Sequence, residues 1–192
     1  MPEPDGEPVS TYLLVDGENI DATLGNSVFG GRRPRPEERP RWERVREFAQ
    51  ATWEQPVKGL FFLNASSGQL PSAFVQALTA MHYRPVPLSG APGQKVVDLG
   101  IQRTLEALAD RPGDVLLTSH DGDFLPQVEA LVDAGRRVGL LAFRELVNLR
   151  YAELQARGLQ VFDLEEDVRA FTVPLPRLKI IQIDDFDPLA FL

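Results

Sequence analysis

The 192-residue sequence contains no cysteine, which excludes disulfide bonds, thiolate metal sites and cysteine nucleophiles. No apolar run approaches the roughly 18 residues that a membrane-spanning helix needs. The first eight residues are acidic and rich in proline, unlike the basic and apolar start of a signal peptide. We therefore expect a cytoplasmic protein that makes no contact with a membrane.

Several motifs that carry well-known chemistry are also absent. The sequence has no glycine-rich dinucleotide-binding or phosphate-binding loop, and no nucleophile elbow. Its hydrophobic content of 43% and charged content of 25% are ordinary for a globular protein that buries one sizeable core. We expect a disordered N-terminus over residues 1–10, one domain over residues 11–171 and a C-terminal extension over residues 172–192.

Positive charge is scarce overall but concentrated in one segment. The net charge of −8 argues against general binding of nucleic acid. Between Arg32 and Glu47, however, seven arginines outnumber four glutamates by +3, which leaves −8 − 3 = −11 for the remainder. Two interpretations stay open: a confined contact with an anion, or arginines that pair with glutamates on a solvated helix face.

Short apolar runs alternate with segments of helical periodicity along the chain. The runs predict strands at residues 11–15, 57–63, 84–88, 115–118, 137–143 and 159–162. The periodic segments predict helices near residues 20–28, 41–54, 71–81, 95–109, 124–134, 144–157 and 164–170, with a loop over residues 30–40. This alternation predicts an α/β fold with three layers, in which a mainly parallel sheet lies between helices. The two prolines of 84–88 place that strand at the sheet edge.

Acidic residues follow two of the predicted strands. Asp16 ends the run 11–15, and Asp121 and Asp123 come shortly after the run 115–118. Asp98 lies three residues before Ile101, on the apolar side of its helix and near the helix N-terminus. Because right-handed crossovers bring the carboxyl ends of parallel strands to one edge, we expect the four carboxylates to meet there.

Four carboxylates without a histidine or cysteine partner set form an oxygen-only site, which suits Mg²⁺ or Mn²⁺ rather than Zn²⁺. The alternative is that Asp16, Asp121 and Asp123 cap helices and that Asp98 pairs with Lys95 or an arginine. We favour the metal site, because one carboxylate is enough for each cap and four acids converge on one edge. An ion bound there would activate water for attack on a phosphodiester.

The polar residues near these acids indicate a function less strongly. Asn19 and Ser119 are expected to orient an acid, a phosphate or a water, or else to cap helices. Lys95 and His120 are placed to contact a substrate, although such residues are more often solvated surface. His82 is expected to be structural.

Three motifs then resemble those of the NYN family, relatives of the PIN-domain nucleases. They are Leu14-Val15-Asp16-Gly17-Glu18-Asn19-Ile20, Lys95-Val96-Val97-Asp98-Leu99 and Thr118-Ser119-His120-Asp121-Gly122-Asp123-Phe124-Leu125-Pro126. The resemblance spans residues 12–163. It departs from the family pattern at His120, where many relatives have a small or amide residue, in the loop 30–41 and after residue 172.

The resemblance implies a PIN-like fold and a ribonuclease that needs divalent metal and leaves 5′-phosphate and 3′-hydroxyl ends. It assigns Asp16, Asn19, Asp98, Asp121 and Asp123 to the acidic site. We add Ser119 as a supporting residue, and RNA-binding roles for Lys95 and His120. Arg32, Arg33, Arg35 and Arg41 are expected to hold the RNA backbone, because the acidic remainder repels it.

Other functions and partners stay open. One alternative is a catalytically weak adaptor that binds RNA or a protein, and another is a phosphatase or DNA nuclease, which shares the metal-assisted chemistry. A homodimer is kept open, as is a protein partner bound through residues 174–192. For that segment we favour the simpler prediction, a C-terminal strand at residues 178–183 with a frayed end.

Overall fold

The computed structural model describes residues 9–192, and its centre is a six-stranded sheet in which all neighbouring strands are parallel. The prediction for the N-terminal residues 1–8 lies outside the described part of the chain. The strands are β1 (Thr11–Asp16), β2 (Val57–Asn64), β3 (Tyr83–Leu88), β4 (Asp114–Thr118), β5 (Val138–Ala142) and β6 (Gln160–Asp163). All six predicted strands are therefore present.

The strand order is β3-β2-β1-β4-β5-β6, so the chain first builds outward from β1 in one direction and then in the other. The order reverses between β1 and β4, the two strands that end at Asp16 and Thr118. In sheets of this kind the loops on either side of the reversal diverge and leave a crevice beyond the strand ends. The predicted edge position of β3 is confirmed.

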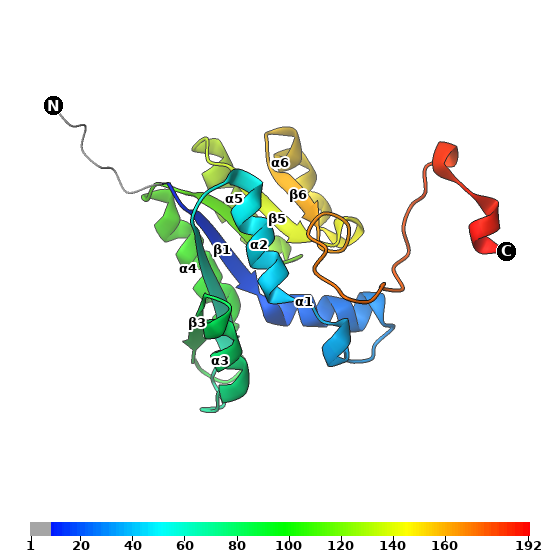
Figure 1. Ribbon diagram of the computed structural model, residues 1–192. Helices are drawn as coiled ribbons and strands as arrows, with labels where there is room; N and C mark the ends of the chain where they lie inside the picture. Colours follow the sequence, from blue (N-terminus) through cyan, green and yellow to red (C-terminus); the bar gives the residue numbers. More distant parts are fainter. Residues whose placement is uncertain (1–8) are drawn as a thin grey trace.

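Helices cover both faces of the sheet and give three layers (Figure 1). On one face the core includes Ile20, Val45 and Leu78, and on the other it includes Ile101 and Val128. The helices are α1 (Gly17–Thr23), α2 (Trp42–Trp53), α3 (Ser72–Ala80), α4 (Val96–Ala109), α5 (Leu125–Asp133) and α6 (Ala152–Ala156). The predicted α/β/α architecture is confirmed. No helix within residues 9–192 is both long and apolar enough to cross a membrane.

The first helix differs from its prediction. It begins at Gly17, directly after β1, because the Asp16 side chain caps it by accepting the Asn19 backbone N–H. It continues into a π-helical segment, η1 (Leu24–Val28). The early start brings Asn19 within one turn of the end of β1.

The prediction of one helix over residues 144–157 is wrong. The segment contains two 3₁₀ turns, η4 (Arg144–Leu146) and η5 (Leu149–Tyr151), followed by the short helix α6. Val147 between them is extended, and the Asn148 side chain caps η5 by accepting the Arg150 N–H. The break has a tertiary cause, because it allows the Tyr151 hydroxyl to donate to the carbonyl of Asp121 at 2.7 Å.

The predicted helix over residues 164–170 is also wrong, since these residues form turns. The carboxylate of Asp163 accepts the backbone N–H groups of Glu165 and Glu166, and Arg169 has a positive φ of 54°. A left-handed residue ends any helical run, and the hydrogen bonds to Asp163 replace those of a helix.

The predicted strand at residues 178–183 is wrong as well. Residues 176–182 have no regular structure, and the chain ends in two 3₁₀ turns, η6 (Ile183–Asp185) and η7 (Pro188–Phe191). Figure 1 shows this segment running away from the body of the molecule, so it pairs with no strand of the sheet. A β-prone sequence without a strand to pair with gains no ladder of hydrogen bonds.

The remaining 3₁₀ turns lie in loops. One is η2 (Pro36–Glu38), within the loop 30–40, and another is η3 (Gly122–Phe124), which leads into α5. The loop 30–40 is held by ion pairs, with Arg32 binding the carboxylate of Glu38 through two hydrogen bonds of 2.7 Å and Arg39 pairing with Asp21 at 3.0 Å.

Candidate active site

Three acidic side chains meet beyond the carboxyl ends of β1 and β4. Asp98 comes from the first turn of α4, and Asp121 and Asp123 come from the loop that joins β4 to α5. One carboxylate oxygen from each lies within 4.8 Å of the other two. Oxygen atoms at such spacing can share one hard divalent cation, and three carboxylates so close repel one another.

Asp16 lies beneath this group and is almost completely buried, with 2% exposure. Burial is the main cause that raises its pKa to about 6, assisted by the charges of Asp98 and Asp121. Hydrogen bonds from the Asn19 N–H and the Ser119 hydroxyl act in the opposite direction. Of the four predicted acids, three therefore form a group that is open to solvent on one side, and the fourth supports it from below.

A chain of hydrogen bonds connects Asp16 to the loop acids. The Ser119 hydroxyl donates to the Asp16 carboxylate at 3.0 Å and accepts the Asp121 N–H at 3.2 Å. The Asp121 carboxylate in turn accepts the Asp123 N–H at 2.9 Å. The residue between the two loop acids is a glycine because Asn148 packs against it: a Cβ on Gly122 would lie 2.5 Å from the Asn148 side chain.

Lys95 is the cation nearest to the acids. Its ammonium nitrogen lies 3.3 Å from Asp98 and 3.5 Å from Asp123, and the side chain is 68% exposed. The hydrogen bond to Asp98 and the acidic surroundings hold the pKa of Lys95 above its ordinary value. Lys95 therefore partly neutralises the group, and its ion pair with Asp98 is the contact that the alternative interpretation of the sequence predicted.

His120 is not at the surface, where we expected it to face a substrate. It is 7% exposed, and its ring stacks on Phe143 with the centroids 5.4 Å apart. Its Nε2 accepts the Phe143 backbone N–H at 2.7 Å, and its own backbone N–H donates to the Asn19 side-chain oxygen at 2.8 Å. Burial lowers the pKa of His120 to about 4, so the ring is neutral near pH 7.

The four arginines predicted to bind RNA differ in whether they form ion pairs. Arg32 is held by Glu38 and lies over the Phe29 ring at 4.2 Å, and Arg35 lies 3.9 Å from Glu37. Arg33 and Arg41 form no ion pair with any other residue in the described part of the chain. Arg33 is exposed and lines a hollow of about 260 Å³ together with Arg32, Arg39 and Asp21.

A second hollow, of about 370 Å³, adjoins the acidic group. Its polar lining includes residues that the sequence analysis did not assign: Glu18, Asn64, Ser66 and Gln94, beside Lys95 and Asp98. Glu18 is two residues from Asp16 and part of the same motif, which was a usable signal. Tyr151, whose hydroxyl donates to the Asp121 carbonyl, lies 30 residues away in the chain, and no local sequence pattern predicts this contact.

Comparisons with known proteins agree with this geometry. A family model described as NYN domain matches residues 10–158. Among solved structures, a protein of unknown function from Vibrio parahaemolyticus is similar, with a TM-score of 0.62 and 19% identity over 87% of this chain and 98% of that one. At this identity the likeness supports the fold alone. A search of curated proteins finds no match.

Proposed function

Because this chain belongs to the NYN domain family of PIN-like nucleases, we propose that it is an endoribonuclease that hydrolyses RNA phosphodiester bonds with Mg²⁺ or Mn²⁺. Membership of the family indicates a nuclease-type hydrolase. The observation that carries the finer proposal is the group formed by Asp98, Asp121 and Asp123, whose oxygen atoms lie within 4.8 Å of one another.

The donor set fits a hard divalent cation. The group offers only carboxylate oxygens, and Asp16 below it adds a fourth negative charge whose burial is unfavourable without a compensating cation. Asp16, Asp98, Asp121 and Asp123 would hold the metal. When bound, such an ion supplies activation of the attacking water and neutralisation of charge at the scissile phosphate.

The protein's own residues position the acids and the substrate. Ser119 keeps one Asp16 oxygen oriented through the hydrogen bond of 3.0 Å. Lys95 stands at the rim of the acidic group, where its ammonium can meet a phosphate oxygen. The hollow lined by Asn64, Ser66 and Gln94 begins beside Asp98 and has room for one nucleotide next to the cleavage point.

The arginines of the loop 30–41 supply attraction for the RNA backbone. The two that form no ion pair in the described residues, Arg33 and Arg41, are the best candidates, because Arg32 and Arg39 are already held by carboxylates. An otherwise acidic surface would confine the RNA to this loop and the cleft edge. We further propose that the protein acts in the cytoplasm, in keeping with its lack of cysteine.

The test compares RNA cleavage by the wild type and by an Asp121→Asn, Asp123→Asn double variant in Mn²⁺. The expected result is a loss of at least about 100-fold in rate, since two proposed ligands lose their charge. An Asp184→Asn, Asp185→Asn variant makes the same change of charge in the C-terminal segment and should cleave normally. Equal rates for all three proteins would remove the hydrolase proposal, and DNA and small phosphate esters in the same assay separate the other hydrolases.

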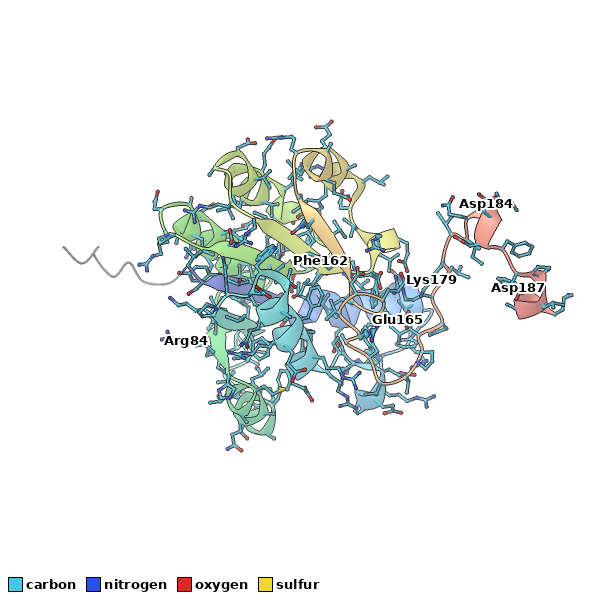
Figure 2. The ribbon with its side chains drawn as sticks, turned by 45° about the horizontal axis from the view of Figure 1, so that its top comes forward. Arg84, Phe162, Glu165, Lys179, Asp184 and Asp187 are labelled. Carbon is cyan, nitrogen blue, oxygen red and sulfur yellow. The ribbon has the colours of Figure 1, made fainter. Side chains whose placement is uncertain are left out.

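A second candidate function, an adaptor, rests on the C-terminal segment. Large apolar side chains are exposed there, and Asp184 and Asp187 lie out from the body (Figure 2). The apolar residues are Leu178, Ile180, Ile181, Ile183, Phe186, Leu189, Phe191 and Leu192. Deleting residues 178–192 distinguishes the two functions, because an enzyme keeps its RNA turnover whereas an adaptor loses, in a pull-down, the partner that it binds through this segment.

A further inference from the structure

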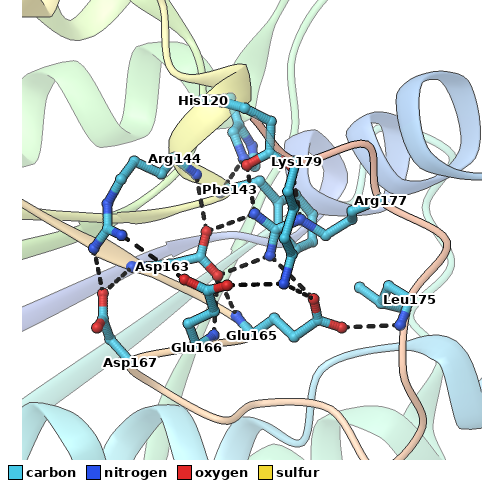
Figure 3. A network of polar contacts seen from close by, with 11 residues as sticks. His120, Phe143, Arg144, Asp163, Glu165, Glu166, Asp167, Leu175, Arg177 and Lys179 are labelled. Carbon is cyan, nitrogen blue, oxygen red and sulfur yellow. Dashed lines mark hydrogen bonds and ion pairs between the residues drawn. The ribbon is translucent and has the colours of Figure 1, made fainter. Parts of the chain in front are cut away.

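His120 occupies a position that neither metal binding nor substrate contact explains. It is the residue between Ser119 and Asp121 of the acidic site, yet its ring points into the core, against Phe143. Phe143 is in turn packed between His120 and Phe171, with the Arg177 guanidinium 4.6 Å from the centre of its ring. Figure 3 shows His120 beside Phe143 at the edge of the polar network around Arg177.

The hydrogen bonds of the ring determine which nitrogen carries the proton. A backbone N–H can only donate, and the Phe143 N–H points at Nε2 of His120 at 2.7 Å. Nε2 therefore has no proton. A neutral imidazole carries one N–H, so the proton is on Nδ1, which lies 3.3 Å from the Asn19 side-chain oxygen.

The same logic determines the orientation of the Asn19 amide. Its oxygen accepts the His120 backbone N–H at 2.8 Å, so the oxygen and nitrogen of the amide cannot be exchanged. With Nδ1–H also directed at that oxygen, the NH₂ group must point away from His120. Within residues 9–192 this NH₂ group has no hydrogen-bond partner, and Asn19 is only half-buried.

We infer that His120 is a positioning residue, which uses its Nδ1–H to hold Asn19 with the amide NH₂ presented to a phosphate oxygen of the substrate. Asn19 is well placed for this task, because its backbone N–H already donates to the Asp16 carboxylate at 3.2 Å. The hydrogen bond to Asp16 thus holds the Asn19 backbone beside the acids, and the hydrogen bond from His120 determines the rotation of the Asn19 amide. The inference rests on the proposed function for its effect on rate, but the proton position and amide orientation do not depend on it.

The support for His120 comes partly from outside the matched family region. Phe171 and Arg177, which flank Phe143, follow residue 158, where the family match ends. The segment that follows the family match therefore packs against Phe143, the residue on which the His120 ring stacks.

The first experiment measures the tautomer directly, by NMR of the ring nitrogens in the full chain at pH 7. His120 should carry its proton on Nδ1 alone, whereas the exposed His82 should show the averaged signals of an exchanging ring. A proton on Nε2, or averaged signals at His120, would overturn the inference. This result is independent of whether RNA is cleaved.

The second experiment separates the two ring contacts. The amide of His120→Asn can replace the donor at Nδ1, and the carbonyl of His120→Gln can replace the acceptor at Nε2. We expect the Mn²⁺-dependent rate at saturating RNA to stay within about 3-fold for His120→Asn, and to fall about 10-fold to 100-fold for His120→Gln. Combining His120→Gln with Asn19→Ala should give no further loss beyond Asn19→Ala alone.

Any result in which His120→Gln is as fast as His120→Asn, or in which its effect multiplies with that of Asn19→Ala, contradicts the inference. If the wild type cleaves no RNA, the proposed function fails instead. The NMR signals of the Asn19 NH₂ group then decide: they should change in His120→Gln and remain in His120→Asn. Melting temperatures of all variants establish that the comparison is between folded proteins.

Discussion

At the scale of single residues, the candidate site combines one buried carboxylate with three more accessible ones. Asp16 is 2% exposed, whereas the side chains of Asp98 and Asp123 are 21% and 54% exposed. The buried acid is the one whose charge is most unfavourable in the folded protein, and its pKa is raised from 3.8 to about 6. The buried charge of Asp16 therefore lowers the stability of the folded protein while it adds negative charge to the site.

We predict that Asp16→Asn stabilises the metal-free protein while it removes activity. Because the pKa of Asp16 in the folded protein is raised, the penalty of its charge is absent below about pH 4, grows as pH rises, and is complete above about pH 6. The variant should gain about 1 to 2 kcal/mol in the free energy of unfolding at pH 7 and little at pH 4. Denaturant titration at both values, with the exposed Asp110→Asn as the control, measures this. A loss of stability at pH 7 would contradict it.

We also predict that Lys95→Ala has opposite effects on metal and on RNA. The ammonium competes with a cation for Asp98 and Asp123, so its removal should lower the Mn²⁺ concentration for half-maximal cleavage by about 2-fold to 5-fold. The KM for RNA should rise, because a phosphate contact is lost. Metal and RNA titrations of the rate measure both. Lys58→Ala, at the opposite end of the sheet, serves as the control, and parallel changes in the two constants would exclude this role.

At the scale of elements, the connection after β6 is held by a cluster of charged side chains around Arg177 (Figure 3). The Arg177 side chain is 2% exposed and binds Asp163, Glu145 and Glu165. Although burial opposes it, the hydrogen bonds and charge of Arg177 hold the pKa of Asp163 below its ordinary value. This cluster replaces the helix that periodicity predicted for residues 164–170, and it determines where the exposed tail leaves the body.

We predict that Arg177→Met destabilises the protein by about 3 kcal/mol at pH 7, because it leaves the buried carboxylate of Asp163 without an opposite charge. Since the pKa of Asp163 is lowered, this contribution is present above about pH 4 and is lost as the pH falls further. Denaturation of the wild type and the variant at pH 7 and pH 3 should show a smaller difference at the lower pH. The more exposed Lys179→Met should cost less than about 1 kcal/mol. An equal cost for the two variants would argue against the cluster as an anchor.

At the scale of the whole molecule, charge is distributed unevenly. The net charge is −8, and the loop 30–41 carries the arginines predicted to bind RNA. This loop lies against residues 170–172, where the Arg41 N–H donates to the Ala170 carbonyl and the Thr172 hydroxyl donates to the Glu37 carbonyl. Because the remainder of the chain is acidic, this loop is where we propose that an anionic substrate binds.

We predict that an Arg33→Ala, Arg41→Ala variant binds RNA more weakly and with less dependence on salt. Removing two phosphate contacts should reduce the slope of log affinity against log salt concentration by about 1.4, or about 0.7 per contact for a single strand. Binding of a short RNA in the absence of divalent metal, measured at several salt concentrations, gives the slope. The control is Arg84→Ala, Arg111→Ala, which changes the charge equally at exposed positions elsewhere. An unchanged slope would place the RNA on another surface.

The order of strands and helices could be predicted because it depends on local patterns. Buried strands of a parallel sheet are continuous apolar runs, and amphipathic helices have a period that is visible in the residues themselves. The convergence of Asp16, Asp98, Asp121 and Asp123 on one edge followed from the direction of parallel strands. Segments 144–157 and 164–170 were mispredicted because Tyr151 and Asp163 hydrogen-bond to groups that local periodicity does not reveal.

By itself, the sequence determined the α/β architecture and the edge that carries the acids, since both depend on residue type and spacing. Only the tertiary structure decided how deeply each acid is buried: Asp16 is almost completely buried, whereas Asp98, Asp121 and Asp123 are more accessible to solvent. It also decided that His120 faces the core and Asn19 rather than a substrate. The physical reason is that burial and hydrogen-bond partners are set by segments far apart in the chain, and no local pattern records which of them will meet.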